Sequence, residues 1–316
     1  MYYETMQKTD CSVIVASHRP NLIESLCKGL LQQKTSSGFR WEIIIVTDYP
    51  HGTLQQHYPD FIWLYLADIS ISKKRNRGVQ LAQGNLLAFI DDDCIPADNW
   101  IEQGCFYLAN HPEATAVEGL TTIAPDPRLP SSATREYRRL EKQGFRTNNL
   151  FFRTDHFRAI GGFDERFTVQ REDIDLAFTA LDKGYRYAYN RDIRVTHVFR
   201  SWEKWDLLKN CWNRRFDPLL FRKHPKQYIA MAGSPLPPTL ALVLLLHVIF
   251  LLSLGKKRSP FLLAGGDALL VALLGIRRAG LRPFSFERIV NETVQIVAAP
   301  FVVIAALLYG WVGNRG

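Results

Sequence analysis

The chain has 316 residues, which is enough for one large domain with an appendage or for two domains. A hydrophobic fraction of 47% with 12% aromatic residues excludes a disordered chain, and the net charge of +8 permits an anionic partner. The five cysteines are odd in number and form no CxxC pair, which argues against a disulfide framework and a zinc site. The amino terminus lacks a basic segment ahead of a long apolar run, so we expect no secretory signal.

The first 230 residues alternate between strand-like and helix-like patterns. Apolar, β-branched runs predict strands at 12–16, 41–46, 62–66 and 86–90, and helical patterns lie at 22–30 and 73–83. The alternation predicts a doubly wound α/β domain with a mostly parallel sheet. Because such sheets bind ligands at the carboxyl ends of their strands, we expect the site in the loops after the first, second and fourth strands.

Three adjacent carboxylates, Asp91, Asp92 and Asp93, end the fourth predicted strand. Like charges at this spacing repel one another, so we expect a cation beside them. Carboxylates together with a substrate diphosphate are typical ligands of Mg²⁺ or Mn²⁺. A turn with helix-capping aspartates is the alternative, although a cap does not need three acids.

A second acidic group contains Glu172, Asp173 and Asp175, where a helix is predicted to begin. Asp173 would lie in the first turn, while Asp175 would point elsewhere on the helix. The alternative is that these acids only stabilise the N-terminal turn through the helix dipole.

The pattern at 202–216, within an interfacial helix region expected over 201–232, predicts an amphipathic basic helix. Aromatic and apolar residues recur every three or four positions at Trp202, Trp205, Leu208, Trp212 and Phe216, and cations fill other faces at Lys204, Lys209, Arg214 and Arg215. Such a segment before an apolar region is typical of a helix at the membrane interface. Packing of the aromatic stripe on the preceding domain is the alternative, and both can hold together.

Residues 233–316 predict a membrane region with two or three hydrophobic helices. The apolar stretches are 236–254, 260–276 and 296–312, and each is barely long enough to cross a bilayer. Basic residues at 277, 278, 282 and 288 favour a cytoplasmic loop. The basic residues at 256–258 lie one apolar stretch earlier and would face the opposite side if both stretches crossed, which conflicts with the preference of basic loops for the cytoplasm. Either 236–276 spans despite this conflict, or it forms a re-entrant hairpin. Asp267 also favours the hairpin, because a carboxylate in the middle of a membrane is costly. Core helices of a soluble domain are the remaining alternative.

Five segments, in order, carry a family resemblance. SVIVASHRPNLIESL, WEIIIVTD, SKKRNRGVQLAQGNLLAFIDDDCIP, NNLFFRTDHFRAIGGFDERF and REDIDLAFTALDKGYRYAY resemble the inverting nucleotide-sugar glycosyltransferases of family 2, which have the GT-A fold. The resemblance covers residues 11 to about 200 and implies a Rossmann-like catalytic domain over residues 1–200.

The resemblance also implies a donor site. Asp93 matches the direct metal ligand of the DxD-type motif, and Asp91 and Asp92 hold metal, ribose or sugar. Asp48 matches the acid that contacts the base, although the family often has two acids where this chain has Thr47 and Asp48. The remaining donor-binding matches are Arg75 and Asn76, which face the nucleotide and diphosphate, and Ser17 and His18, which line the nucleotide pocket.

On the acceptor side, Glu172 and Asp173 match the ED motif, in which the aspartate is the catalytic base. Asp164 and Asp175 are expected near the sugar or acceptor. His197 matches a histidine that joins the metal or diphosphate in many GT-A enzymes, with a structural role as the alternative. Together these matches predict a metal-dependent displacement that inverts the anomeric carbon.

We therefore expect a membrane-associated glycosyltransferase that moves a sugar from a nucleoside-diphosphate sugar to a hydroxyl acceptor. The acceptor is expected to be lipid-linked or a cell-surface glycan precursor, and the catalytic domain to face the cytoplasm at the cell membrane. Alternatives are a polyprenyl-phosphate glycosyltransferase, a processive polysaccharide synthase, which the lack of a QxxRW sequence disfavours, and a non-catalytic nucleotide-binding membrane scaffold. Membrane lipids are expected partners, and nucleic acid is not.

Overall fold

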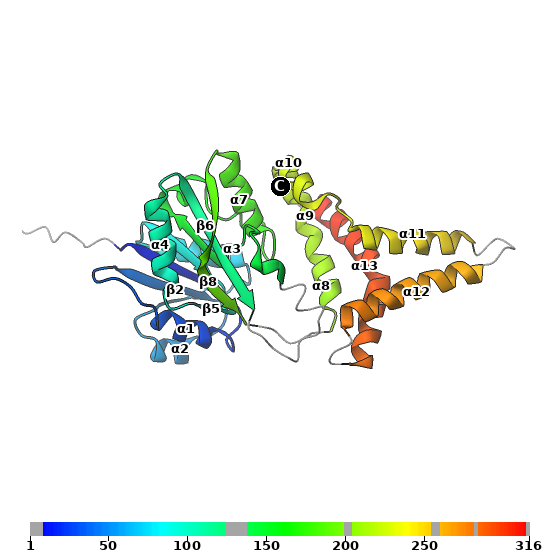
Figure 1. Cartoon of the computed structure of the whole chain (residues 1–316), viewed down its shortest axis with the longest axis horizontal. Coiled ribbons are helices and arrows are strands. Elements are labelled where there is room, and N and C mark those ends of the chain that lie inside the picture. Colours follow the sequence, from blue (N-terminus) through cyan, green and yellow to red (C-terminus); the bar gives the residue numbers. More distant parts are fainter. Residues whose placement is uncertain (1–8, 124–137, 199–203, 254–259, 281–283, 314–316) are drawn as a thin grey trace, which may run out of the picture. The chain divides into compact units, whose positions relative to one another are not determined.

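The computed structural model describes residues 9–123, 138–198, 204–253, 260–280 and 284–313 (Figure 1). They divide into two compact units, the first ending at residue 198 and the second starting at residue 204. Each unit is described by itself. Trp202 and the basic residues at 256–258 and 282, which entered the predictions, lie outside the described residues.

The first unit alternates strands and helices, as the sequence pattern predicts (Figure 1). Its elements are β1 (Cys11–Ser17), α1 (Ile23–Leu31), β2 (Trp41–Thr47), α2 (Gly52–His57), β3 (Ile62–Tyr65), α3 (Ile71–Leu81), β4 (Leu86–Ile90), β5 (Cys94–Pro96), α4 (Trp100–Asn110), β6 (Ala114–Ile123), η1 (Arg138–Glu141), β7 (Asn149–Arg153), α6 (Thr154–Ala159), α7 (Glu172–Asp182) and β8 (Arg186–His197). The result is a Rossmann-like α/β domain.

The eight described strands form one sheet in the order β3-β2-β1-β4-β7-β6-β8-β5. Strands β1 to β4 are parallel to their neighbours within that block, and β6 is parallel to β8. Strand β7 is antiparallel to both β4 and β6, and β5 is antiparallel to β8. The sheet is therefore mixed, and the expected parallel arrangement holds for the β1–β4 block. A continuous apolar run indicates that a strand is buried on both faces, but it does not indicate in which direction the strand runs.

Each face of the sheet carries its own hydrophobic core. Residues alternate between the faces along each strand, so that Val13 and Val15 of β1 join one core and Ile14 joins the other. Helices α1 and α4 cover the first face, and α3, α6 and α7 cover the second. Gly104 of α4 lies so close to β7 that an added Cβ would be 2.3 Å from the Phe151 ring. Both layers hold the strand ends rigidly in place.

The second unit is helical. Its elements are α8 (Asp206–Asn213), the 3₁₀ helix η2 (Arg214–Phe216), α9 (Asp217–Lys223), α10 (Pro225–Ala232), α11 (Pro238–Ser253), α12 (Pro260–Ala279) and α13 (Phe286–Gly313). Within the region 201–232, the described residues form several short helices, with α8 and η2 at the position of the predicted aromatic and basic pattern. Pro218 and Pro225 each occupy a helix start, where the missing N–H costs nothing but a continuous helix would be interrupted.

Helices α11 and α12 form an antiparallel hairpin, in which Val243 packs near Val271 and His247 Nδ1 lies 2.8 Å from Asp267 Oδ2 (Figure 1). The carboxylate that stood out in the apolar sequence thus has an ionisable partner on the neighbouring helix. Among the described residues, one helix, the 28-residue α13, is long and apolar enough to cross a membrane, judged by length and composition. Helix α11 has 16 residues, fewer than the roughly 17 that a span needs.

Candidate active site

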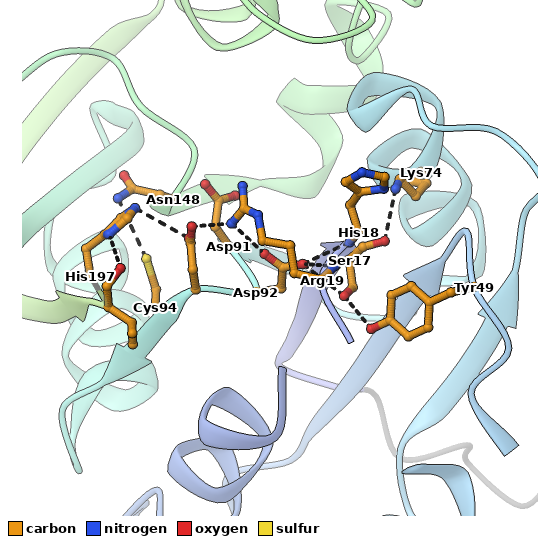
Figure 2. Close-up of polar contacts among 12 residues, drawn as sticks. Ser17, His18, Arg19, Tyr49, Lys74, Asp91, Asp92, Cys94, Asn148 and His197 are labelled. Carbon is orange, nitrogen blue, oxygen red and sulfur yellow. Dashed lines mark hydrogen bonds and ion pairs between the residues drawn. The ribbon is translucent and has the colours of Figure 1, made fainter. Parts of the chain in front are cut away.

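The acidic triplet lies where three neighbouring parallel strands end. Strand β1 pairs with β2 on one side and with β4 on the other, so their carboxyl ends meet at one edge of the sheet. The loop after β1 begins with His18, the loop after β2 with Asp48, and the loop after β4 with Asp91. Figure 2 shows side chains from these loops pointing toward one another. This convergence is what the strand pattern predicts for a doubly wound sheet.

Asp92 is buried and binds the loop after β1 (Figure 2). Its Oδ2 accepts hydrogen bonds from the backbone N–H groups of His18 (2.8 Å) and Arg19 (3.0 Å). The Ser17 hydroxyl also donates to Oδ2 (3.0 Å), and Arg19 Nη1 donates to Oδ1 (3.0 Å). Both carboxylate oxygens of Asp92 are therefore used within the protein, and Asp92 fixes the conformation of the loop.

Asp48 lies between the side chains of His18 and Lys74. His18 Nδ1 is 2.6 Å from Asp48 Oδ2, and Lys74 Nζ donates to the same oxygen at 3.0 Å. Burial alone would raise the pKa of Asp48, but the hydrogen bonds from Lys74 and His18 outweigh it and hold that pKa below its usual value. Lys74 also donates to the Ser17 carbonyl at 2.9 Å. Asp48 is consequently an ionised acceptor beside the exposed His18 ring.

Arg75 connects the two acidic groups of the sequence. It is 2% exposed and projects from α3, with Nη2 donating to Asp91 Oδ1 (2.6 Å) and Nη1 donating to Glu172 Oε1 (2.9 Å). The guanidinium also lies over the Phe163 ring, 5.4 Å from its centroid. The end of β4 and the start of α7 are thus held by one buried cation, although 81 residues separate Asp91 from Glu172 in the sequence.

Asp93 faces His197 across the end of the sheet. Residues Cys94 and His197 are paired between β5 and β8, which brings His197 Nε2 to 3.5 Å from Asp93 Oδ1. His197 Nδ1 lies 2.9 Å from the Val198 carbonyl, which can only accept, so Nδ1 carries hydrogen. In the neutral imidazole, Nε2 is then the lone-pair nitrogen and it faces a carboxylate oxygen. Two acceptors at this distance call for a proton or a cation.

This donor set fits a divalent cation. A carboxylate oxygen and an imidazole nitrogen suit Mn²⁺ well, and carboxylates alone suit Mg²⁺. Cys94 lies in the same cluster, and burial, followed by the charges of Asp91 and Asp93, raises the pKa of its thiol. The Arg19 guanidinium binds Asp93 as well as Asp92, and it supplies the positive charge next to the triplet in this structure (Figure 2).

The acidic start of α7 has raised pKa values. Burial, followed by the negative charge of Asp173, raises the pKa of Glu172 to about 8, and Glu172 Oε2 is buried without a hydrogen-bond partner. Burial also raises the pKa of Asp173, against a hydrogen bond that its Oδ1 accepts from the Ile174 N–H (2.8 Å). A carboxylate with a raised pKa is the stronger base, which is the property that a general base needs.

Two of the predicted residues, Asn76 and Asp164, stabilise the loop before α7. Asn76 Nδ2 donates to the Phe163 carbonyl (2.8 Å), and its Oδ1 accepts from the Phe163 N–H (3.0 Å). Asp164 accepts hydrogen bonds from the Arg166 guanidinium at Nη2 (2.7 Å) and Nε (3.0 Å). Asp175 is 2% exposed, so its carboxylate lies inside the protein.

Three side chains of this site were not predicted from the sequence. Arg19 follows His18 directly, Lys74 precedes Arg75, and the Tyr49 hydroxyl lies 2.6 Å from the Ser17 hydroxyl. Burial raises the pKa of Tyr49 to about 12, so this hydroxyl stays neutral. The loop after β1 was expected to line the site, and a basic residue in it was a signal that could have found Arg19.

The fold and the acidic strand ends define a Rossmann-like domain of the GT-A type. Residues 11–163 match the family model described as Glycosyl transferase family 2. Residues 11–163 therefore form a domain of that glycosyltransferase family.

Two relatives from Haloferax volcanii are similar to this chain. A glucosyl-dolichyl phosphate glucuronosyltransferase is 26% identical over 233 residues, which cover 64% of this chain and 74% of that protein. The glycosyltransferase AglE is 27% identical over 135 residues, which cover 40% of this chain and 43% of that protein.

Proposed function

We propose that this protein is a membrane-associated inverting glycosyltransferase that moves a sugar from a nucleoside-diphosphate sugar to a hydroxyl group of a lipid-linked acceptor. The observation that carries the proposal is the buried Arg75, which binds both Asp91 and Glu172. Through it, the acids at the end of β4 and those at the start of α7 belong to one site. For displacement to occur, the sugar donor and the acceptor hydroxyl must be held next to each other in one site.

The donor is proposed to bind at the ends of β1, β2 and β4. Asp48 accepts from a base or ribose group, and the exposed His18 ring lines the same pocket with Ser17. Asp93 and His197 would hold Mg²⁺ or Mn²⁺, assisted by Asp91. The bound ion would neutralise charge on the departing nucleoside diphosphate. Arg19 lies beside the same carboxylates and adds a fixed positive charge where the diphosphate would lie.

Asp173 is the proposed catalytic base, with Glu172 beside it. Asp173 removes the proton of the acceptor hydroxyl as its oxygen attacks the anomeric carbon, and the bond to the diphosphate oxygen breaks on the opposite face. The raised pKa of Asp173 supports this role, since a stronger base takes the proton more readily. An acceptor phosphate is already anionic and needs no base. Asp164 and Asp175 are proposed to organise the acceptor side, through Arg166 in the case of Asp164.

The names of the relatives support a lipid-linked acceptor. A glucosyl-dolichyl phosphate, as named for one of them, already carries a sugar on a lipid phosphate, and its free nucleophiles are sugar hydroxyls. The long apolar helix α13 supports membrane association of the present chain. Basic residues at Arg277, Arg278 and Arg288 flank the hydrophobic helices, and we propose on that ground that the catalytic domain faces the cytoplasm.

The test is slow donor hydrolysis by the detergent-purified protein. A panel of UDP-, GDP- and dTDP-sugars is incubated with and without Mn²⁺ or Mg²⁺. We expect cleavage of one donor class that depends on the metal, is lost in Asp93→Asn and is kept in Asp60→Asn, a control that removes an exposed carboxylate. Nucleotide binding without cleavage of any donor would favour a catalytically silent scaffold. Cleavage that survives in Asp93→Asn would overturn the assignment of the metal ligand.

A further inference from the structure

We propose that helix α13 does not cross the membrane and lies along one leaflet of an anionic bilayer, together with α8 and α9. The inference rests on the membrane association given under the proposed function and specifies its form. Its consequence is that both ends of α13 remain on the side of the membrane that holds the catalytic domain.

The first observation is that α8, η2 and α9 run beside α13 over most of its length. The contacts along this interface are Leu208 with Gln295, Cys211 with Ala299, Arg215 with Gly310, and Arg222 with Trp311. Residue numbers rise together on both sides, so the two helical segments are parallel. The contacts on α13 extend from residue 295 to residue 311, which is about 24 Å at 1.5 Å per residue.

Helices α8 and α9 lie close to α13 along this interface. The Leu208 N–H donates to Gln295 Oε1 at 3.3 Å. Near the other end, a Cβ added to Gly310 would be 1.9 Å from the Arg215 carbonyl oxygen, so the backbones are in contact there. Lys204 Nζ pairs with Glu287 Oε1 at 2.5 Å, which extends the contact to the first turn of α13. Helix α13 therefore cannot enter the bilayer at an angle without taking α8 and α9 with it.

The second observation is the charge on these accompanying helices. Within the 24 Å stretch they carry Lys209, Arg214, Arg215, Asp217 and Arg222. Arg214 pairs with Asp217 at 3.1 Å, and all of these charged side chains would enter the hydrocarbon if α13 crossed. Each charge at the centre of a bilayer disfavours insertion by about 100-fold. A crossing orientation would include several such charges.

The third observation is that the exposed apolar side chains of α13 form one stripe. Seven of them, Val290, Val294, Val297, Phe301, Ile304, Leu308 and Val312, recur at intervals of three or four residues, while Phe286, Tyr309 and Trp311 near the two ends are exposed as well. The buried residues of the helix include Gln295, Ala299, Val303, Ala306 and Gly310, which face other helices. One apolar face with cations beside it is typical of a helix that lies in the interfacial plane.

The cations are arranged as expected for the level of the lipid headgroups. The Arg222 guanidinium lies over the Trp311 ring, 4.4 Å from its centroid, and Arg215 lies over the Phe216 ring at 4.5 Å. Tryptophan and arginine together are frequent at this level of a bilayer, because each has an apolar body and a polar end. Anionic headgroups complement these cations, which identifies a leaflet with anionic lipid as the partner.

The test measures depth at three points of the stripe. Val290→Cys, Ile304→Cys and Val312→Cys, each carrying a spin label, are reconstituted in vesicles of phosphatidylcholine and phosphatidylglycerol. The natural cysteines are buried, so the unmodified chain gives the labelling background, and Lys142→Cys gives an aqueous reference in the first unit. Val290 and Val312 are about 33 Å apart along the helix.

We expect the three labels at similar depth, about 5–10 Å below the headgroup boundary. A label at Ile304 that is far deeper than the other two would overturn the proposal, because a crossing helix is deepest at its middle. Labels that contact only the aqueous relaxation agent at all three positions would instead refute membrane association itself, and with it that part of the proposed function.

A second measurement needs no change within the helices. An epitope tag is added after Gly316, and sealed vesicles are treated with a protease from outside. We expect the tag to be cleaved in the same fraction of molecules whose catalytic domain is cleaved. Protection of the tag in molecules with an accessible catalytic domain would show that the chain crosses the bilayer.

Discussion

Replacing Arg75 with glutamine should lower the free energy of unfolding by about 3–5 kcal/mol at pH 9, where Glu172 is ionised, because the change leaves the buried Glu172 carboxylate and the partly buried Asp91 carboxylate without their cation. Arg75 is 2% exposed, and its two hydrogen bonds to Asp91 and Glu172 are 2.6 and 2.9 Å long. For a unit of about 150–250 residues, each 1 kcal/mol shifts the melting temperature by about 2–4 °C, so a decrease of about 6–20 °C is expected.

The matched control is Arg77→Gln, two residues further along α3. Arg77 is exposed and donates to Gln80 on its own helix, so its loss should stay within about 0.5 kcal/mol. Both variants are followed by thermal unfolding with circular dichroism in the same detergent. A decrease for Arg75→Gln that equals the decrease for Arg77→Gln would refute the argument that Arg75 compensates buried charge.

The pH dependence provides a further check on the same reasoning. The pKa of Glu172 is about 8 in the folded protein, above its unfolded value of about 4.3, so this acid stabilises the fold at low pH. That contribution is lost as the pH rises from about 4 through about 8. Because Arg75 supports the ionised form of Glu172, the deficit of Arg75→Gln should be larger at pH 9 than at pH 6. An equal deficit at both values would contradict this assignment.

Three other predictions follow from the site and the core. Asp173→Asn should lower turnover by about 10²–10⁴-fold, while donor binding measured by calorimetry is unchanged. Because the base must be deprotonated, wild-type turnover should decrease as the pH falls through the raised pKa of Asp173. His197→Ala should weaken Mn²⁺ binding, measured by electron paramagnetic resonance, by about 10- to 100-fold, and an unchanged affinity would remove His197 from the ligand set. Gly104→Ala should cost about 1–3 kcal/mol, because the new Cβ meets the Phe151 ring at 2.3 Å, whereas Gly52→Ala, with open space around it, should be near neutral in thermal unfolding.

The sequence was sufficient for the parallel part of the fold. Continuous apolar runs such as 86–90 are buried on both faces, and a helix begins at Glu172 as the acidic pattern indicated. The direction of β7 was not predictable, because NLFFR specifies burial but not which neighbours the strand will have. The direction of a strand depends on the segment that connects it to the preceding strand, and the residues of the strand itself do not specify it.

The sequence pointed to the acids of the site and to Arg75, but not to Arg19 and Lys74. Carboxylates at strand ends stand out because they follow apolar runs, but Arg19 and Lys74 lie among other polar residues with no such contrast. The expected positive charge beside the triplet led to a metal ion, while the structure also provides the Arg19 guanidinium. Asn76, which the motif suggested for donor binding, also holds a neighbouring loop through the Phe163 backbone, and this contact was not foreseen from the sequence.

The bonding of Asp92 has a practical consequence for anyone who needs an inactive form of this enzyme. A triple replacement of the acidic triplet would seem the safest choice, but Asp92 holds the turn after β1 through two peptide N–H groups, a hydroxyl and a guanidinium. Replacing Asp92 would disturb the folded loop, so a loss of activity in that variant would not identify a catalytic role. Asp93 alone is the informative position, because its neighbour keeps the architecture of the strand end intact.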